Sequence, residues 1–344
     1  MPHTSYPRGN APSHPTVPNT AGTREGSIVK VLRYISFSFL LSFIASFAAA
    51  QVNDTYVIPV SANVPGAFGT RWMTQFSVFN PQTQYPLTVS VTYLPTLGGK
   101  GIEVLFEVPP NSVAFSDNLL QDLYGISGSG ALLVATFPED NPGVPNDVLS
   151  RAIAVTSNTY NNVQSGTYGQ TVPGLWTGLQ DFDTDGISAI AHGVRNIARL
   201  GWRTNVGATN LGRNSVVMYV TVYDADGATL LNKAPFTIPP MAHLQDRLPI
   251  EVDRGSVEFF VDDPTQSAVV FPYISTIDQL SGDPTYQTPV LLAGAKTLYN
   301  KAALAPQTIG TKIDITTARA VRATASRIGV AKLTRTNSGL QLTR

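Results

Sequence analysis

The chain has 344 residues, of which 43% are hydrophobic, 13% are charged and none is cysteine. This length allows about two domains, and the lack of cysteine excludes disulfide scaffolds, zinc fingers, iron–sulfur clusters and thiol catalysis. The charge is uneven: residues 1–50 carry +3, residues 51–292 carry −11 and residues 293–344 carry +8. A negatively charged body repels nucleic-acid phosphates, so no nucleic-acid partner is expected.

Residues 1–50 have the pattern of an N-terminal extension followed by an export signal. Lys30 and Arg33 precede the apolar run 35–47, and three alanines at 48–50 follow it. The run is shorter than the ~20 residues of a membrane-spanning helix. It therefore predicts a secretory signal peptide, with Gln51 at the start of the mature chain and no membrane span after cleavage.

An uncleaved signal anchor is the alternative to this interpretation. The Pro-rich stretch 2–27 is unusual before a signal peptide, which suggests that translation begins near Val29 or Val31. Export without cysteine fits a bacterial protein that is secreted or held at the cell surface.

The sequence repeats itself at an offset of 130 residues. The matched residues are Trp72 with Trp202, Thr74 with Thr204, Asn80 with Asn210, Tyr93 with Tyr223, and Pro109-Pro110 with Pro239-Pro240. We expect an internal duplication, with repeat 1 at 51–175, an acidic linker at 176–186 and repeat 2 at 187–292.

The offset between matched residues of the two copies decreases along the chain. Repeat 1 therefore carries two insertions relative to repeat 2. One lies around 111–127, where SDNLLQDLYG has helical spacing, and the other lies in the loop 138–149. Insertions of this kind occur on surfaces, where binding specificity is usually found. The alternative is that these loops drift without a function.

Within each copy the apolar residues alternate with polar ones. Leu87, Val89, Val91 and Tyr93 alternate with Thr88, Ser90 and Thr92, and the second copy places Val217, Tyr219, Thr221 and Tyr223 at the same positions. This period of two predicts strands with one buried face. About seven short strands per copy with little helix indicate an all-β chain of two tandem immunoglobulin-like β-sandwich domains.

The pattern VIPVSANVPGAFGTRWMTQFSVFNP, followed by a double proline, SGSGAL and SNTYN…GTYGQTVPG, resembles a repeat of uncharacterised secreted bacterial β-sandwich proteins. The tetrapeptide that starts at Trp202, Trp-Arg-Thr-Asn, matches that pattern closely, whereas the one at Trp72 departs from it as Trp-Met-Thr-Gln. The resemblance covers both repeats and the signal, but not the tail. It implies the fold and export and lends no catalytic residues.

No catalytic constellation is visible in the sequence. Of the four histidines, His192 and His243 are not repeated features, and His3 and His14 precede the mature chain. The sequence has no nucleophile elbow, phosphate-binding loop or His-Glu-x-x-His motif. The chain is therefore not expected to be an enzyme, although a hydrolase with a dispersed site remains the alternative.

The linker contains the one motif that resembles a ligand site. Asp181, Asp183 and Asp185 alternate before Gly186, as in the opening of a calcium-binding loop. The glutamate expected at loop position twelve is missing, and no flanking helices are evident. A solvated polar linker is the alternative, and no other cofactor is expected. The acidic loop with Glu139, Asp140 and Asp147 is a second, weaker candidate.

Aromatic residues and the tail leave further alternatives open. Trp72 and Trp202 suggest packing in the core of each repeat rather than sugar stacking, and Trp176 suggests packing where the domains meet. The basic tail 293–344 predicts either electrostatic contact with anionic envelope polymers, docking on the chain's own acidic body, or disorder.

These observations favour an exported, non-enzymatic protein with a structural or adhesive role at the bacterial surface. The alternative is a secreted carbohydrate- or protein-binding module whose site is formed by the repeat 1 insertions. The partner would be a surface polymer or protein.

The calcium hypothesis predicts a shift in thermal stability. If the linker aspartates bind the ion only in the folded state, calcium should raise the melting temperature relative to a chelator by mass action. The measurement is thermal unfolding in both conditions, together with calorimetry. An unchanged melting temperature with no bound ion would rule the site out.

Overall fold

The computed structural model describes residues 53–66, 69–163, 166–176, 188–261, 268–292, 315–337 and 339–344. The export signal, the linker aspartates Asp181, Asp183 and Asp185, and tail residues 293–314 lie outside the described residues, so these predictions stay untested. Strands dominate the described part, which confirms the all-β class. No helix described there has both the length and the apolarity to cross a membrane.

The described strands agree with the predicted ones in place and exceed them in number. The first half contains β1 (Thr55–Pro65), β2 (Arg71–Asn80), β3 (Leu87–Pro95), β4 (Ile102–Val108), β5 (Ser112–Ser116), β6 (Gly128–Ala135), β7 (Ala154–Val163) and β8 (Gly166–Thr171). The second half contains β9 (Ser188–Asn196), β10 (Trp202–Asn210), β11 (Val216–Tyr223), β12 (Thr229–Ile238), β13 (Ala242–Arg247), β14 (Val252–Val261), β15 (Val270–Asp278), β16 (Pro284–Gln287) and β17 (Val290–Leu292). The additional strands β5, β13 and β17 are short, so they carry little alternation.

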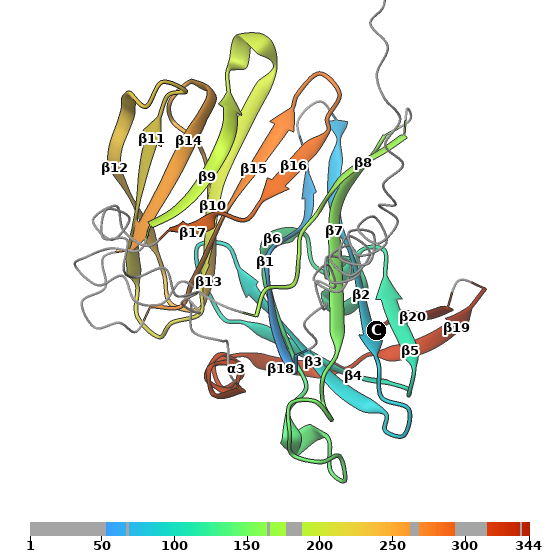
Figure 1. The fold of residues 1–344 in the computed structure, drawn as a ribbon. Helices are drawn as coiled ribbons and strands as arrows, with labels where there is room; N and C mark the ends of the chain where they lie inside the picture. Colours follow the sequence, from blue (N-terminus) through green and yellow to red (C-terminus); the bar gives the residue numbers. More distant parts are fainter. Residues whose placement is uncertain are drawn as a thin grey trace, which may run out of the picture. The chain divides into compact units, whose positions relative to one another are not determined.

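The two halves pair their strands in the same order (Figure 1). One series is β4-β3-β6-β1 in the first half and β12-β11-β14-β9 in the second. The other series is β5-β2-β7-β8, which corresponds to β13-β10-β15-β16. In the second half these series are separate sheets, whereas a short ladder between β1 and β2 joins them in the first.

This strand order differs from the predicted immunoglobulin order. An immunoglobulin domain pairs its first strand with its second and its seventh with its sixth. Here the first strand of the second half, β9, pairs with the sixth, β14, and the seventh, β15, pairs with the second, β10. The connection from β9 to β10 is a single 3-10 turn (Ala198–Leu200) ending at Gly201 with φ of 79°, and it carries the chain to the opposite sheet instead of making a hairpin.

The repeated asparagine and the double proline form the same hydrogen-bonded arrangement in both halves. The amide nitrogen of Asn80 donates to the carbonyl oxygens of Val108 and Pro109, at 3.0 and 3.2 Å. In the second half, Asn210 donates to the carbonyl oxygens of Ile238 and Pro239, at 3.4 and 3.1 Å. Each asparagine therefore ties the end of one strand to the double proline that starts the next turn.

Each half has its own apolar core. In the first, Leu87, Val89, Val91 and Tyr93 are buried, as the alternation predicts. In the second, the buried residues of β11 are Val216, Met218, Val220 and Val222. The predicted register of β11 is therefore wrong by one residue. Because this strand is apolar on both faces, its alternation could not decide which side faces inward.

A third apolar cluster is shared by both halves and the tail. Its buried members are Val57, Leu94, Ala131, Leu133, Ala135, Phe137, Leu211, Val269, Phe271, Ala318 and Val321. The hydroxyl of Thr209 also donates to the carbonyl oxygen of Pro59 across the two halves, at 2.8 Å. Residues 52–344 accordingly form one compact unit.

The described part of the tail is folded, so the prediction of disorder is wrong for residues 315–337 and 339–344. It forms helix α3 (Ile315–Arg322) and strands β18 (Ser326–Val330), β19 (Lys332–Thr336) and β20 (Gly339–Thr343). β18 pairs in parallel with β4 and β20 pairs in parallel with β5, so the tail, drawn in red in Figure 1, adds strands to the first half. These pairings cover strand edges that would otherwise be free to pair with another chain.

Ion pairs hold the tail in place. The Nε atoms of Arg322 and Arg327 lie 2.7 and 2.9 Å from the carboxylate oxygens of Glu103, whose side chain is 4% exposed. Arg322 also lies 2.6 Å from Asp140, and the Arg319 guanidinium lies 2.8 Å from Glu139. The acidic loop 138–149 thus binds the tail through Glu139 and Asp140, which explains the acidic pair without a metal ion.

We expect Arg322→Ala to lower the free energy of unfolding by about 3 kcal/mol, because it leaves the buried Glu103 carboxylate with one cation fewer. The matched control is Arg319→Ala on the same helix. Its ion pair with Glu139 is half-exposed on both sides, so its loss should cost less than about 1 kcal/mol. Denaturant unfolding measures both. Equal effects of the two variants would contradict the proposed role of Glu103.

Candidate functional site

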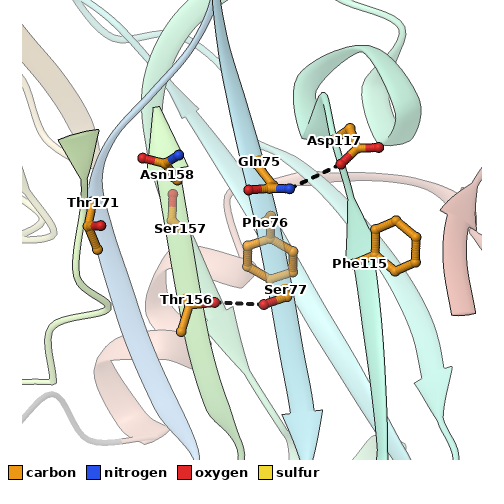
Figure 2. Close-up of a pocket in the computed structure, with 9 residues that line it drawn as sticks. All are labelled: Gln75, Phe76, Ser77, Phe115, Asp117, Thr156, Ser157, Asn158 and Thr171. Carbon is orange, nitrogen blue, oxygen red and sulfur yellow. Dashed lines mark hydrogen bonds between the residues drawn. The ribbon is translucent and has the colours of Figure 1, made fainter. Parts of the chain in front are cut away.

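A polar groove of about 670 Å³ lies over strands β5, β2, β7 and β8. Its lining residues are Gln75, Phe76, Ser77, Phe115, Asp117, Thr156, Ser157, Asn158 and Thr171, all drawn in Figure 2. We call this surface the polar groove.

The register of the sheet arranges the exposed side chains of the polar groove in two rows. In one row Asn158 stands opposite both Gln75 on β2 and Thr171 on β8. In the other row Ser77 stands opposite both Phe115 on β5 and Thr156 on β7. Because side chains on one face recur every second residue, these rows place amides, hydroxyls and one aromatic ring side by side across four strands.

Two hydrogen bonds fix the side chains within the rows, as the dashed lines of Figure 2 show. The Gln75 amide nitrogen donates to the Asp117 carboxylate at 3.1 Å, and the hydroxyls of Ser77 and Thr156 lie 2.6 Å apart. The groove therefore presents partly ordered donors and acceptors to solvent, together with the half-exposed ring of Phe115.

Part of the polar groove comes from the first insertion predicted in repeat 1. Phe115 and Asp117 belong to that segment, which continues into one turn of π-helix, η2 (Leu120–Tyr124). Leu120, Leu123 and Tyr124 are buried in the core of the first half, so this turn is anchored. The other groove residues come from regular strands, and only the pairing of those strands brings them together.

Two of the three tryptophans lie elsewhere than predicted. Trp72 and Trp202 are half-exposed and belong to neither core, so their interpretation as core residues is wrong. Each stands near the beginning of its strand, beyond the packed interior. The Arg195 guanidinium carbon lies 4.7 Å from the ring centroid of Trp202. Trp176 is partly buried against the core of the first half.

His243 joins the two halves, and no motif or repeat in the sequence indicated this role. This side chain is fully buried, with Nδ1 lying 2.8 Å from the Thr96 hydroxyl and Nε2 lying 2.7 Å from the Tyr273 hydroxyl. Tyr273 in turn donates to the amide oxygen of Gln245 at 2.8 Å. Burial lowers the pKa of His243 to about 3, so the ring is neutral at physiological pH. His192, by contrast, is exposed.

The described residues give no support to the weaker calcium candidate. Within the described ranges, no group of three or more His, Asp or Glu residues is placed to hold a metal ion. The stronger calcium candidate, the linker aspartates Asp181, Asp183 and Asp185, lies outside these ranges and stays a prediction.

Comparison with known proteins found no matching family model and no matching curated protein. The resemblance to secreted bacterial repeat proteins therefore stays a prediction.

His243 predicts a specific loss of stability in acid. Its pKa is about 3 in the folded chain and about 6.5 in an unfolded chain. Between these values only the unfolded chain binds the proton, so the free energy of unfolding falls by about 1.4 kcal/mol per pH unit as the pH drops from 6 to 4. This contribution is fully present above pH 6.5.

The control is His243→Gln, which lacks the titrating ring while all carboxylates remain. The stability difference between the two proteins should shrink as the pH falls, and denaturant unfolding at several pH values measures it. A difference that does not depend on pH would contradict the assignment.

Proposed function

We propose that this chain is an exported, non-catalytic protein that adheres to a neutral polysaccharide at the bacterial surface through the polar groove. The observation that carries the proposal is the pair of side-chain rows across β5, β2, β7 and β8. The N-terminal signal pattern supports export, and the resemblance to secreted bacterial repeat proteins agrees with it.

The chemistry of the polar groove suits sugar hydroxyl groups. Amide and hydroxyl side chains can both donate and accept hydrogen bonds, as a polyhydroxylated ligand requires. Phe115 offers a ring face for the apolar side of a sugar. Asp117 is the only charged residue that lines the groove, so the groove favours a neutral polymer over an anionic one.

The same lining favours binding over hydrolysis. Most glycoside hydrolases use two carboxyl groups that flank the scissile bond. The polar groove contributes one carboxylate, Asp117, and that group accepts a hydrogen bond from Gln75. We therefore propose that the groove holds its polymer without cleaving it.

We also infer that the two halves arose by duplication of one sandwich-like unit. The shared pairing order and the matching bonds of Asn80 and Asn210 support this inference. The positive φ of 49° at both Asn111 and Met241, which follow the two double prolines, supports it further. After duplication, the copy with the longer insertions would have acquired the groove.

The test is co-sedimentation of the full chain with insoluble xylan, glucan and mannan. We expect at least one polysaccharide to retain the protein, and we expect Phe115→Ala and Asn158→Ala to weaken retention at least tenfold. A tenfold loss corresponds to about 1.4 kcal/mol of binding free energy.

The matched control is Tyr219→Ala, which removes a half-buried aromatic ring from β11 of the second half. It should leave retention unchanged. Retention that is insensitive to Phe115 and Asn158, or absent from all three polymers, would overturn the proposal in favour of a purely structural role.

A further inference from the structure

A second cavity of about 260 Å³ lies between the two halves. The first half contributes Trp72, Thr159 and Gln170 to its lining, and the second half contributes Arg203, Gln245 and Ser275. We call it the Arg203 cleft. It shares no lining residue with the polar groove.

Arg203 has no anionic partner in the described part of the chain. Its Nε atom is buried and has no hydrogen-bond partner there. Burial and, secondarily, the nearby Arg247 charge lower the pKa of Arg203 from its ordinary value. A partly buried cation without a counter-charge is unfavourable, and an anion would offset that cost.

Two amide side chains in the cleft lining, those of Gln170 and Gln245, accept hydrogen bonds from within the chain. The Ser275 hydroxyl donates to the Gln170 amide oxygen at 3.0 Å, and the Tyr273 hydroxyl donates to the Gln245 amide oxygen at 2.8 Å. Each amide nitrogen can also donate N–H bonds to a ligand. Arg203 is the one charged residue among the described residues that line the cleft, so the cleft favours an anion.

The remaining features narrow the class of anion. The cleft is slightly smaller than typical ligand pockets, which begin at roughly 300 Å³, and this size suits a single sugar unit. The half-exposed indole of Trp72 offers a flat apolar face to a sugar ring. We propose that the Arg203 cleft binds one sugar acid, a hydroxylated carboxylate of the uronic acid class, with Arg203 holding the carboxylate.

The test is calorimetric titration of the full chain with glucuronate, glucose and acetate. We expect glucuronate to bind at least tenfold more tightly than either of the other two. Arg203→Gln should abolish this preference, whereas Arg247→Gln, which removes an exposed charge outside the cleft lining, should change affinity less than threefold. Phe115→Ala in the polar groove should leave glucuronate binding unchanged, so this test is independent of the proposed function.

A measurement on the unmodified protein keeps the test decisive if a variant fails to fold. The Nε–Hε NMR signal of Arg203 should shift on addition of glucuronate and stay in place with glucose. Equal binding of acetate would show a simple anion site, and equal binding of glucose would show a neutral one. Either result, or shifts confined to other arginines, would overturn the proposal.

Discussion

The burial of one apolar cluster by three distant parts of the chain is the constraint on which the rest of the structure depends. Leu94 and Phe137 come from the first half, Phe271 from the second, and Val321 from the tail. None of these parts can remove its share of the cluster from water alone, and burial of this kind is the main favourable term in folding. The halves therefore behave as one unit, although each has its own core.

That shared cluster also accounts for the polar groups at the boundary between the halves. Once the apolar residues fix the two halves against each other, His243 and Tyr273 are enclosed and must satisfy one another and Thr96. Arg203, at the same boundary, is a cation that no described acid meets. A buried polar chain that is complete indicates a structural role, whereas an unmatched cation beside it indicates a ligand.

The sequence was informative where chemistry is local. Alternation located the strands, and the recurring Asn80 and Pro109-Pro110 residues coincide with hydrogen bonds that both halves make. The sequence did not show which face of β11 is buried, because both faces of that strand are apolar. It also did not show that β9 pairs with β14 and β15 with β10, because these pairings are non-local. The rows of the polar groove are likewise invisible in sequence, since Gln75 and Asn158 become neighbours only through the register of β2 and β7.

Because the described part of the tail is folded, the uneven distribution of charge along the chain needs a different interpretation. A basic tail beside an acidic body suggested an external anionic partner, docking on the body itself, or disorder. In the structure, Arg319, Arg322 and Arg327 pair with Glu139, Asp140 and Glu103 of the same chain. Their charges are thus largely neutralised within the molecule and contribute little to long-range attraction. Recognition of an anion must then depend on a local, partly desolvated cation, where pairing is stronger than at an exposed surface. In the described cavities, Arg203 meets that requirement.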